Sequence, residues 1–342
     1  AIQMRAETTC GRARVRQPWR PSRRSTTATT AEPARSPHAV RASGALDDRL
    51  DVLRHASQSK PIKVVAGPKP IPIGIICADG HPSTRAARKA ALALGRDGYC
   101  VCRCGLERGV VADAAREAAA LYRKRCMQPG GFTVGGAPVQ GRGHVEGGKK
   151  GNRNDHVLWL HEYLNAVGGP QRGEAEMLLA LDELVSAFGQ AVIDTLSDID
   201  KKDLPLGSAS DGNPLYYTGR TDLMVACYPG GGAAYGPHVD NADGDGRQEE
   251  DYGRCFTAVL YLNTRWDEAN GGALRVFLPK VGTVEEKDVV DIYPHGDTLV
   301  LFRADRVVHE VRPAHAERLA MTVWMYAGSK EQQRRQRSAS GR

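Results

Sequence analysis

Apolar side chains recur at helical spacing in three segments of the first 200 residues. Residues 86–94 and 111–126 repeat them every three or four positions, and residues 174–196 do the same over a longer stretch. This period is typical of amphipathic helices that bury one face against a core. We therefore expect three such helices in this part of the chain.

Short apolar runs bounded by Gly, Pro and Asp clusters dominate the chain after residue 211. Strands are expected at residues 223–228, 238–240, 255–262, 273–277, 289–292, 298–302, 309–311 and 318–325, and earlier at 98–104 and 155–159. About eight short strands separated by turns predict a sandwich or barrel. The fold class is therefore expected to be mainly β with supporting helices.

Composition divides the chain into four parts. Residues 1–45 hold nine arginines against two acids and few apolar side chains, so we expect a disordered basic tail or an organelle transit peptide. Sequence translated upstream of a start at Met4 is a further alternative. Residues 46–88 are expected to be a linker and the start of the helical support, residues 89–327 the folded domain, and residues 328–342 a second disordered basic tail.

The net charge of +7 belongs to the N-terminal tail, and the body between the two tails is slightly acidic. This distribution argues against a nucleic-acid-binding core. No apolar run is long enough for a membrane span, and no secretory signal is recognisable. We therefore expect an intracellular protein, in the cytoplasm or nucleus, or in a mitochondrion or chloroplast if residues 1–45 are a transit peptide.

Eight cysteines in 342 residues are too few for a disulfide scaffold. Cys227 and Cys255 lie within apolar runs and are expected to pack as small hydrophobic side chains. Cys100, Cys102 and Cys104 alternate onto one face of a predicted strand. A metal site there would need a fourth ligand, which the sequence does not supply nearby, so ordinary strand packing is the favoured interpretation.

His238 and Asp240 carry the strongest local chemical signal. On a strand, the period of two directs both side chains to one side and Val239 to the other. An imidazole and a carboxylate that converge in this way are two members of the facial triad of non-haem Fe(II) oxygenases, which requires a second histidine. His309, in a later predicted strand, is the best candidate among the ten histidines.

A cation for an acidic co-substrate follows His309 in the sequence. Alternation places Arg318, Thr322 and Trp324 on one face of their predicted strand. A guanidinium beside an open iron site suits a dicarboxylate, because its planar fork matches a carboxylate. Tyr261 lies on one face of the strand at 255–262 and can donate a second hydrogen bond to the same carboxylate.

These residues lie within ordered segments that resemble the hypoxia-inducible-factor type prolyl 4-hydroxylases, the EGL-nine family. The segments are GRTDLMVACYPG at 219–230, YGPHVDN at 235–241, GDGR at 244–247, LYLN at 260–263, GGALR at 271–275, HEVRP at 309–313 and RLAMTVW at 318–324. The resemblance covers roughly residues 90–327. It implies a double-stranded β-helix, or jelly roll, and hydroxylation of a prolyl residue in an intracellular protein, with an oxygen-sensing role left open.

The resemblance also implies roles for single residues. Its metal ligands would be His238, Asp240 and His309, its catalytic set would add Arg318, and its co-substrate pocket would hold Tyr228, Tyr261, Arg318, Thr322 and Trp324. Fe(II) would be the metal, 2-oxoglutarate and O₂ the co-substrates, and L-ascorbate the reductant. The expected partner is a protein with a target proline, neither nucleic acid nor membrane, and the enzyme is expected to be a monomer.

The substrate side of the resemblance is less complete. Asp155 and Trp159 match a segment that follows a mobile loop in the family, so residues 130–151 are expected to be that loop. A seven-residue insertion follows Arg247, so either Arg247 or Arg254 matches the family's rim arginine. Two other functions stay open: a related hydroxylase acting on collagen-like, cell-wall proline-rich or ribosomal proteins, and a non-catalytic jelly-roll binding module.

Overall fold

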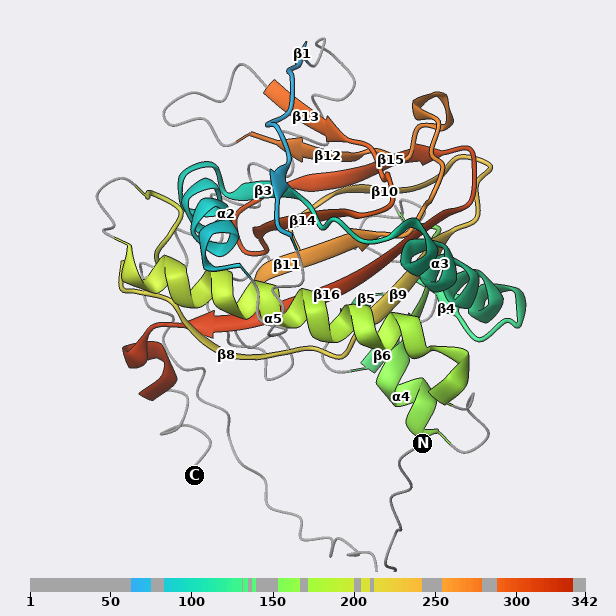
Figure 1. Cartoon of the computed structure of the whole chain (residues 1–342), viewed down its shortest axis with the longest axis horizontal. Coiled ribbons are helices and arrows are strands. Elements are labelled where there is room, and N and C mark those ends of the chain that lie inside the picture. The colour runs from blue at the N-terminus through green and yellow to red at the C-terminus, as the bar shows by residue number, and fades with distance from the viewer. Residues whose placement is uncertain are drawn as a thin grey trace, which may run out of the picture. The chain divides into compact units, whose positions relative to one another are not determined.

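Two large β-sheets, a separate two-stranded hairpin and a layer of helices form the part of the chain that the computed structural model describes (Figure 1). The described residues are 63–74, 83–130, 132–134, 137–139, 153–166, 172–199, 204–209, 212–241, 254–278 and 288–334. The expected tail at residues 1–45 lies outside them.

The smaller sheet has five strands in the order β1-β13-β12-β15-β10. Its strands are β1 (Lys63–Val64), β10 (Ala233–His238), β12 (Leu274–Phe277), β13 (Asp288–Ile292) and β15 (His309–Ala314).

The larger sheet has the order β2-β3-β14-β11-β16-β9-β7-β4, and β8 also pairs with β16. Its strands are β2 (Ile71–Pro72), β3 (Tyr99–Arg103), β4 (Gln128–Pro129), β7 (His156–Trp159), β8 (Tyr216–Arg220), β9 (Met224–Tyr228), β11 (Arg254–Tyr261), β14 (Thr298–Arg303) and β16 (Arg318–Gly328). From β9 to β16 the chain passes back and forth between the two sheets. This topology confirms the predicted mainly β, jelly-roll fold.

The central strands of the larger sheet are buried on both faces. On β16, Leu319, Met321 and Val323 face the helices, whereas Ala320 and Trp324 face the smaller sheet. The same alternation holds along β11 and β14, which explains why these segments read as continuous apolar runs. The expected shared face of Arg318, Thr322 and Trp324 therefore points between the sheets.

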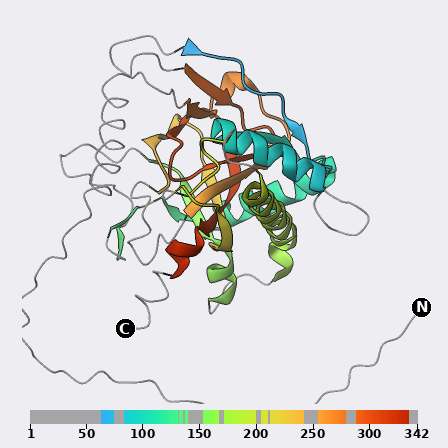
Figure 2. The same ribbon diagram turned by 90° about the vertical axis from the view of Figure 1, so that its left-hand side faces the viewer.

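Helices α2 (Thr84–Asp97), α3 (Arg108–Arg123) and α5 (Glu176–Asp198) cover the outer face of the larger sheet and confirm the three predicted helices. Figures 1 and 2 show α2 and α5 on the same side of the strands. The other helical segments are α4 (Leu160–Asn165), η1 (Arg172–Glu174) and η3 (Glu268–Asn270). Helix α2 ends at Gly98, whose φ of 81° suits glycine.

The chain departs from the sequence expectations in three places. The expected linker at 46–88 contributes β1 and β2 to the two sheets. Within the expected loop at 130–151, the described residues include a hairpin of β5 (Phe132–Val134) and β6 (Ala137–Val139), whereas residues 140–151 lie outside the described part. The expected disordered tail at 328–342 begins with a helical turn at 330–334, where the Ser329 hydroxyl accepts the Gln332 N–H and the Gln332 side chain accepts the Ser329 N–H.

The six described cysteines are free, and five of them are buried. Burial raises the pKa of Cys227 and of Cys255 to about 12, so both are inert thiols. Cys100, Cys102 and Cys104 are buried in the core cluster that also contains the helices, which confirms the predicted ordinary strand packing.

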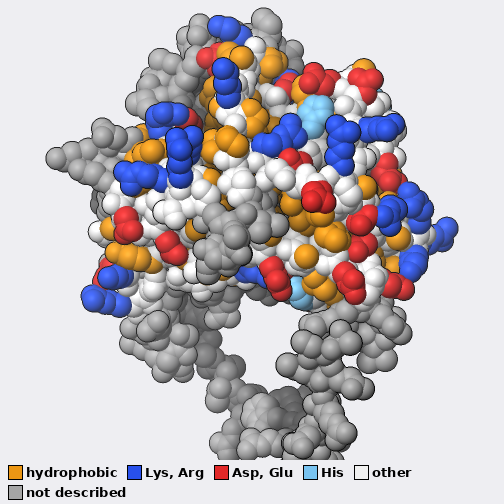
Figure 3. Space-filling model, in the orientation of Figure 1, with side chains coloured by type: hydrophobic (Ala, Val, Ile, Leu, Met, Phe, Trp, Pro, Cys, Tyr) orange, Lys and Arg blue, Asp and Glu red, His pale blue; other side chains and the backbone are white. Residues whose placement is uncertain are grey.

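The surface over the helices carries side chains of both signs. Figure 3 shows lysine and arginine interspersed with aspartate and glutamate across this face. Within the described segments, no helix has the length and apolar character that crossing a membrane requires.

Candidate active site

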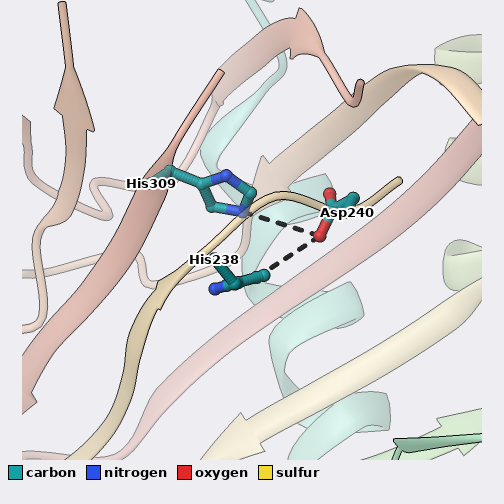
Figure 4. A group of neighbouring side chains, drawn as sticks. All are labelled: His238, Asp240 and His309. Carbon is teal, nitrogen blue, oxygen red and sulfur yellow. Dashed lines mark ion pairs between the residues drawn. The ribbon is translucent and has the colours of Figure 1, made fainter. Parts of the chain in front are cut away.

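His238, Asp240 and His309 converge between the two sheets, where β10 ends and β15 begins. His238 is the last residue of β10 and His309 the first of β15, and the two lie directly opposite each other in the register. Their Nε2 atoms are 3.3 and 3.6 Å from Oδ1 of Asp240. Figure 4 shows both imidazoles directed at this carboxylate.

Asp240 is not on a strand, so the expected strand at 238–240 is wrong beyond His238. The chain leaves the smaller sheet after His238, and Asp240 reaches the larger one. Its Oδ2 accepts hydrogen bonds from Thr257 Oγ1 on β11, at 2.7 Å, and from Trp324 Nε1 on β16, at 3.0 Å. The position of Asp240 is therefore fixed by side-chain hydrogen bonds to the larger sheet and not by backbone pairing within a strand.

The three side chains fit a divalent metal. The Nδ1 atom of His238 is 2.8 Å from the Gly236 carbonyl, and that of His309 is 3.1 Å from the Val307 carbonyl. Because a carbonyl can only accept, each Nδ1 carries the proton, and each Nε2 keeps its lone pair. The ligand atoms of all three residues lie within 4.8 Å of one another, as a common metal requires.

Burial and mutual contact keep His309 and Asp240 in the metal-binding protonation state. Burial lowers the pKa of His309 to about 4, and repulsion from His238 adds to this effect. Burial opposes the charge on Asp240, but His309, His238 and Thr257 together hold its pKa well below the usual value. At neutral pH the site therefore presents a neutral His309 imidazole and a carboxylate.

Arg318 lies buried at the start of β16, with 2% of its surface exposed. Its Nε donates to the Gly272 carbonyl at 2.8 Å, and its guanidinium lies over the rings of Tyr228 and Tyr261. Among the described residues Arg318 forms no ion pair with a carboxylate, and the buried Tyr261 hydroxyl donates no hydrogen bond. A buried cation beside an unused donor is a site for an anion.

Asn263, which sequence reasoning missed, anchors the backbone of Leu319, the residue that follows Arg318. Its side chain donates to the carbonyls of Pro294 and Leu319 and accepts the Leu319 N–H at 2.8 Å. The position of Asn263 in the LYLN segment, two residues after Tyr261, was the signal that could have identified it.

Of the other predicted co-substrate residues, Thr322 is buried on the face shared by Arg318 and Trp324. Trp324 has a different contact from the one expected, because its indole N–H bonds Asp240. Thr257 was missed as an Asp240 partner, although it shares a strand face with Tyr261.

The predicted substrate residues fall into three groups. Trp159 packs beside Trp324 with ring centroids 5.7 Å apart, and the Arg254 guanidinium lies 4.7 Å from the Trp324 ring centroid. Asp155 is 1% exposed and ion-paired with Arg153, which disfavours direct contact with a protein substrate. Arg247 lies outside the described residues.

Comparisons with known proteins agree with this geometry. Residues 223–326 match the model of the 2OG-Fe(II) oxygenase superfamily. The chain is 39% identical to prolyl hydroxylase EGLN3 of Mus musculus over 168 residues, which are 47% of this chain and 64% of that protein. It is 32% identical to hypoxia-inducible factor prolyl hydroxylase of Caenorhabditis elegans over 214 residues, 61% of this chain and 24% of that protein.

A solved structure is similar over a larger share of the chain. It is a prolyl hydroxylase from Trichoplax adhaerens in complex with a hypoxia inducible factor oxygen degradation domain peptide fragment. The match has a TM-score of 0.50 and 25% identity, and it covers 73% of this chain and 91% of that chain. The chain spans less than two thirds of the length of the curated relatives described above. Residues 223–326 therefore resemble a 2OG-Fe(II) oxygenase domain, and the relatives to which the chain is similar include the EGLN prolyl hydroxylases.

Proposed function

We propose that this protein is an Fe(II)- and 2-oxoglutarate-dependent prolyl 4-hydroxylase that acts on a proline of an intracellular protein. The observation that carries the proposal is the pairing of two features inside one jelly roll. The three-residue candidate metal site contacts β16 at Trp324, and the buried guanidinium of Arg318, which has no ion pair among the described residues, lies at the start of the same strand. The prolyl substrate is inferred from the names of the relatives, which are prolyl hydroxylases.

Each residue has a distinct task in this proposal. His238, Asp240 and His309 would hold the Fe(II), which supplies the redox chemistry by which O₂ and 2-oxoglutarate hydroxylate a C–H bond. Arg318 and Tyr261 would bind the distant carboxylate of 2-oxoglutarate. The apolar wall around Arg318 excludes water and strengthens that charge pairing.

The entrance would be lined by Trp159, Trp324 and Arg254. The two indole rings offer an apolar surface for a proline ring, and Arg254 offers a donor to the peptide backbone.

We further propose ascorbate as the reductant that maintains ferrous iron, and an intracellular location. The free, buried thiols of the described residues support a reducing compartment. The absence of an acid partner for Arg318 within the described part supports an acidic small molecule as co-substrate.

The test is turnover with a defined metal and peptide. The protein is loaded anaerobically with Fe(II) and supplied with 2-oxoglutarate and a library of proline-containing peptides, and mass spectrometry locates any hydroxyproline. His238→Ala, Asp240→Ala and His309→Ala should each abolish product, whereas the surface control His295→Ala should retain it. Hydroxylation of Pro-Pro-Gly repeats alone would support the collagen-type alternative, and absence of 2-oxoglutarate turnover would support a binding module.

Arg318→Lys separates the co-substrate pocket from the metal site. Lysine keeps the charge but loses the planar fork, so 2-oxoglutarate should bind about 10- to 100-fold more weakly. Metal affinity should stay unchanged. An unaltered half-saturating 2-oxoglutarate concentration would show that another residue binds that carboxylate.

A further inference from the structure

The ring of Tyr235 stacks on the imidazole of His238. Their centroids are 3.7 Å apart and their planes differ by 14°. In a regular strand, residues three positions apart point to opposite faces, so this contact requires an irregularity. The register supplies it: Tyr235 lies opposite Val311 and His238 opposite His309, so β10 uses one more residue than β15 over this interval.

This bulge, at Gly236 and Pro237, has two effects on the metal ligand. It brings Tyr235 under His238, and it turns the Gly236 carbonyl toward Nδ1 of His238 at 2.8 Å. The ring is thus held both by a stacking partner and by a hydrogen bond in its plane.

The other face of the Tyr235 ring is covered by Arg153. The guanidinium carbon lies 4.6 Å from the Tyr235 centroid, and because His238 occupies one face, Arg153 occupies the opposite one. Arg153 is fixed by Asp155 through two hydrogen bonds, at 2.5 Å from Nε and 2.9 Å from Nη2. The side chains of Arg153 and Asp155 are 12% and 1% exposed, so water screens this pair little.

The backbone secures the same arrangement. Arg153 and Tyr235 form an antiparallel bridge, and Asn154 exchanges hydrogen bonds with Ala234 through its backbone N–H and its side-chain oxygen. Residues 153–155 thus lie along the edge of β10, next to the strand end that carries His238.

We propose that Arg153 and Asp155 are positioning residues for the metal ligand His238 and that they act through Tyr235. The layered order Asp155, Arg153, Tyr235, His238 restricts rotation of the imidazole and keeps Nε2 directed at Asp240. The cation over the Tyr235 ring is favourable because the ring face is negative. This inference rests on the metal-binding role of His238 in the proposed function and does not depend on the prolyl substrate.

The test measures metal binding directly, without turnover. Co(II) is titrated anaerobically into the metal-free full chain, and its visible d–d absorption reports both affinity and ligand geometry. Tyr235→Leu should weaken Co(II) binding about 10- to 100-fold, the range found when outer partners of a ligand are removed. Tyr235→Phe keeps the stacked ring and should bind Co(II) within about 2-fold of the wild type.

Arg153→Met and Asp155→Asn examine the outer layers. Each should weaken Co(II) binding by about 2- to 30-fold and alter the d–d spectrum. In Arg153→Met the Tyr235 ring loses its cation, and in Asp155→Asn the Arg153 guanidinium loses its ion pair. The matched control is Tyr216→Leu on β8. This change also removes a ring that contacts a cation, since the Lys330 ammonium lies 4.9 Å from the Tyr216 ring centroid, and it should leave Co(II) binding unchanged.

Circular dichroism confirms that each variant is folded at the temperature of the titration. Wild-type Co(II) affinity and spectrum in folded Arg153→Met and Asp155→Asn would overturn the proposal, even if Tyr235→Leu does not fold. Normal Co(II) binding without peptide hydroxylation in the wild type would instead refute only the proposed substrate.

Discussion

Protonation at the metal site is set by the few atoms that surround each ligand. His309 packs between His238 and Phe302, with ring centroids 4.2 and 4.4 Å away, so its charged form is poorly solvated. Asp240 has the opposite balance, because two imidazoles and two hydrogen-bond donors favour its charged form. Single contacts therefore decide that the site is ready for a cation at neutral pH.

The depressed pKa of His309 predicts acid sensitivity in the metal-free protein. The unfolded chain takes up this proton near pH 6.5, whereas the folded protein takes it up only near pH 4. Between these values the unfolded state binds more protons, so the free energy of unfolding should fall by up to about 3 kcal/mol as the pH drops. The pKa of Asp240 is lowered from 3.8, so protonation of this carboxylate should further reduce the free energy of unfolding as the pH falls below about 3.8.

Urea unfolding of the chelator-treated protein at a series of pH values measures this slope. His309→Gln has no proton to take up in that range and should show a flatter dependence between pH 6.5 and 4. Equal slopes for the two proteins would assign the acid sensitivity to other groups.

Helix α5 illustrates packing between elements. It lies against β16, and its buried Asp182 is bonded by Arg220 of β8 at 2.8 Å. Gly189 is the point of closest approach, because a side chain there would overlap the fully buried Met325 of β16. Glycine is otherwise unfavourable in a helix interior, so close packing accounts for its presence.

Gly189→Ala should therefore destabilise the protein. Overpacking costs about 1–3 kcal/mol, and the better helix propensity of alanine offsets at most about 1 kcal/mol of it. Gly109 in α3 provides the control, because no heavy atom lies within 4 Å of an added Cβ there. Gly109→Ala should leave stability unchanged or raise it by up to about 1 kcal/mol, as chemical denaturation can show. Equal effects at the two positions would contradict this account of α5.

At the scale of the whole molecule, the net charge and the folded core belong to different segments. The net charge of residues 1–45 equals the net charge of +7 of the whole chain, whereas every described strand and helix begins at Lys63 or later. The charge of the tail therefore says little about the chemistry of the fold.

Removal of residues 1–45 should leave the free energy of unfolding within about 0.5 kcal/mol of the full chain, since the segment offers no apolar face to the core. The isoelectric point should fall from about 9.0 toward neutrality, because the other residues balance in charge. Thermal denaturation and isoelectric focusing measure the two quantities. A loss of several kcal/mol would mean that the tail packs on the domain.

Much of the site could be predicted from local patterns in the sequence. Alternation along 318–325 placed Arg318, Thr322 and Trp324 on one face, and the structure has them there. The two histidines and Asp240 were selected by residue type and order, and they converge. Alternation was sufficient along 318–325 because side-chain direction in a strand has a period of two, whatever the partner strand. Asp240 lies beyond the end of β10, so its place beside the two histidines does not follow from alternation.

Tertiary structure decided what depends on pairing between distant segments. The bulge that stacks Tyr235 on His238 depends on how β10 pairs with β15. The hydrogen bonds from Thr257 and Trp324 of the larger sheet reach Asp240, which directly follows the end of the smaller sheet's β10. Register and sheet order are set by packing between residues far apart in the chain, which no local pattern records. By itself the sequence determined the fold class and selected the candidate metal ligands, whereas only the folded chain determined how those side chains are held.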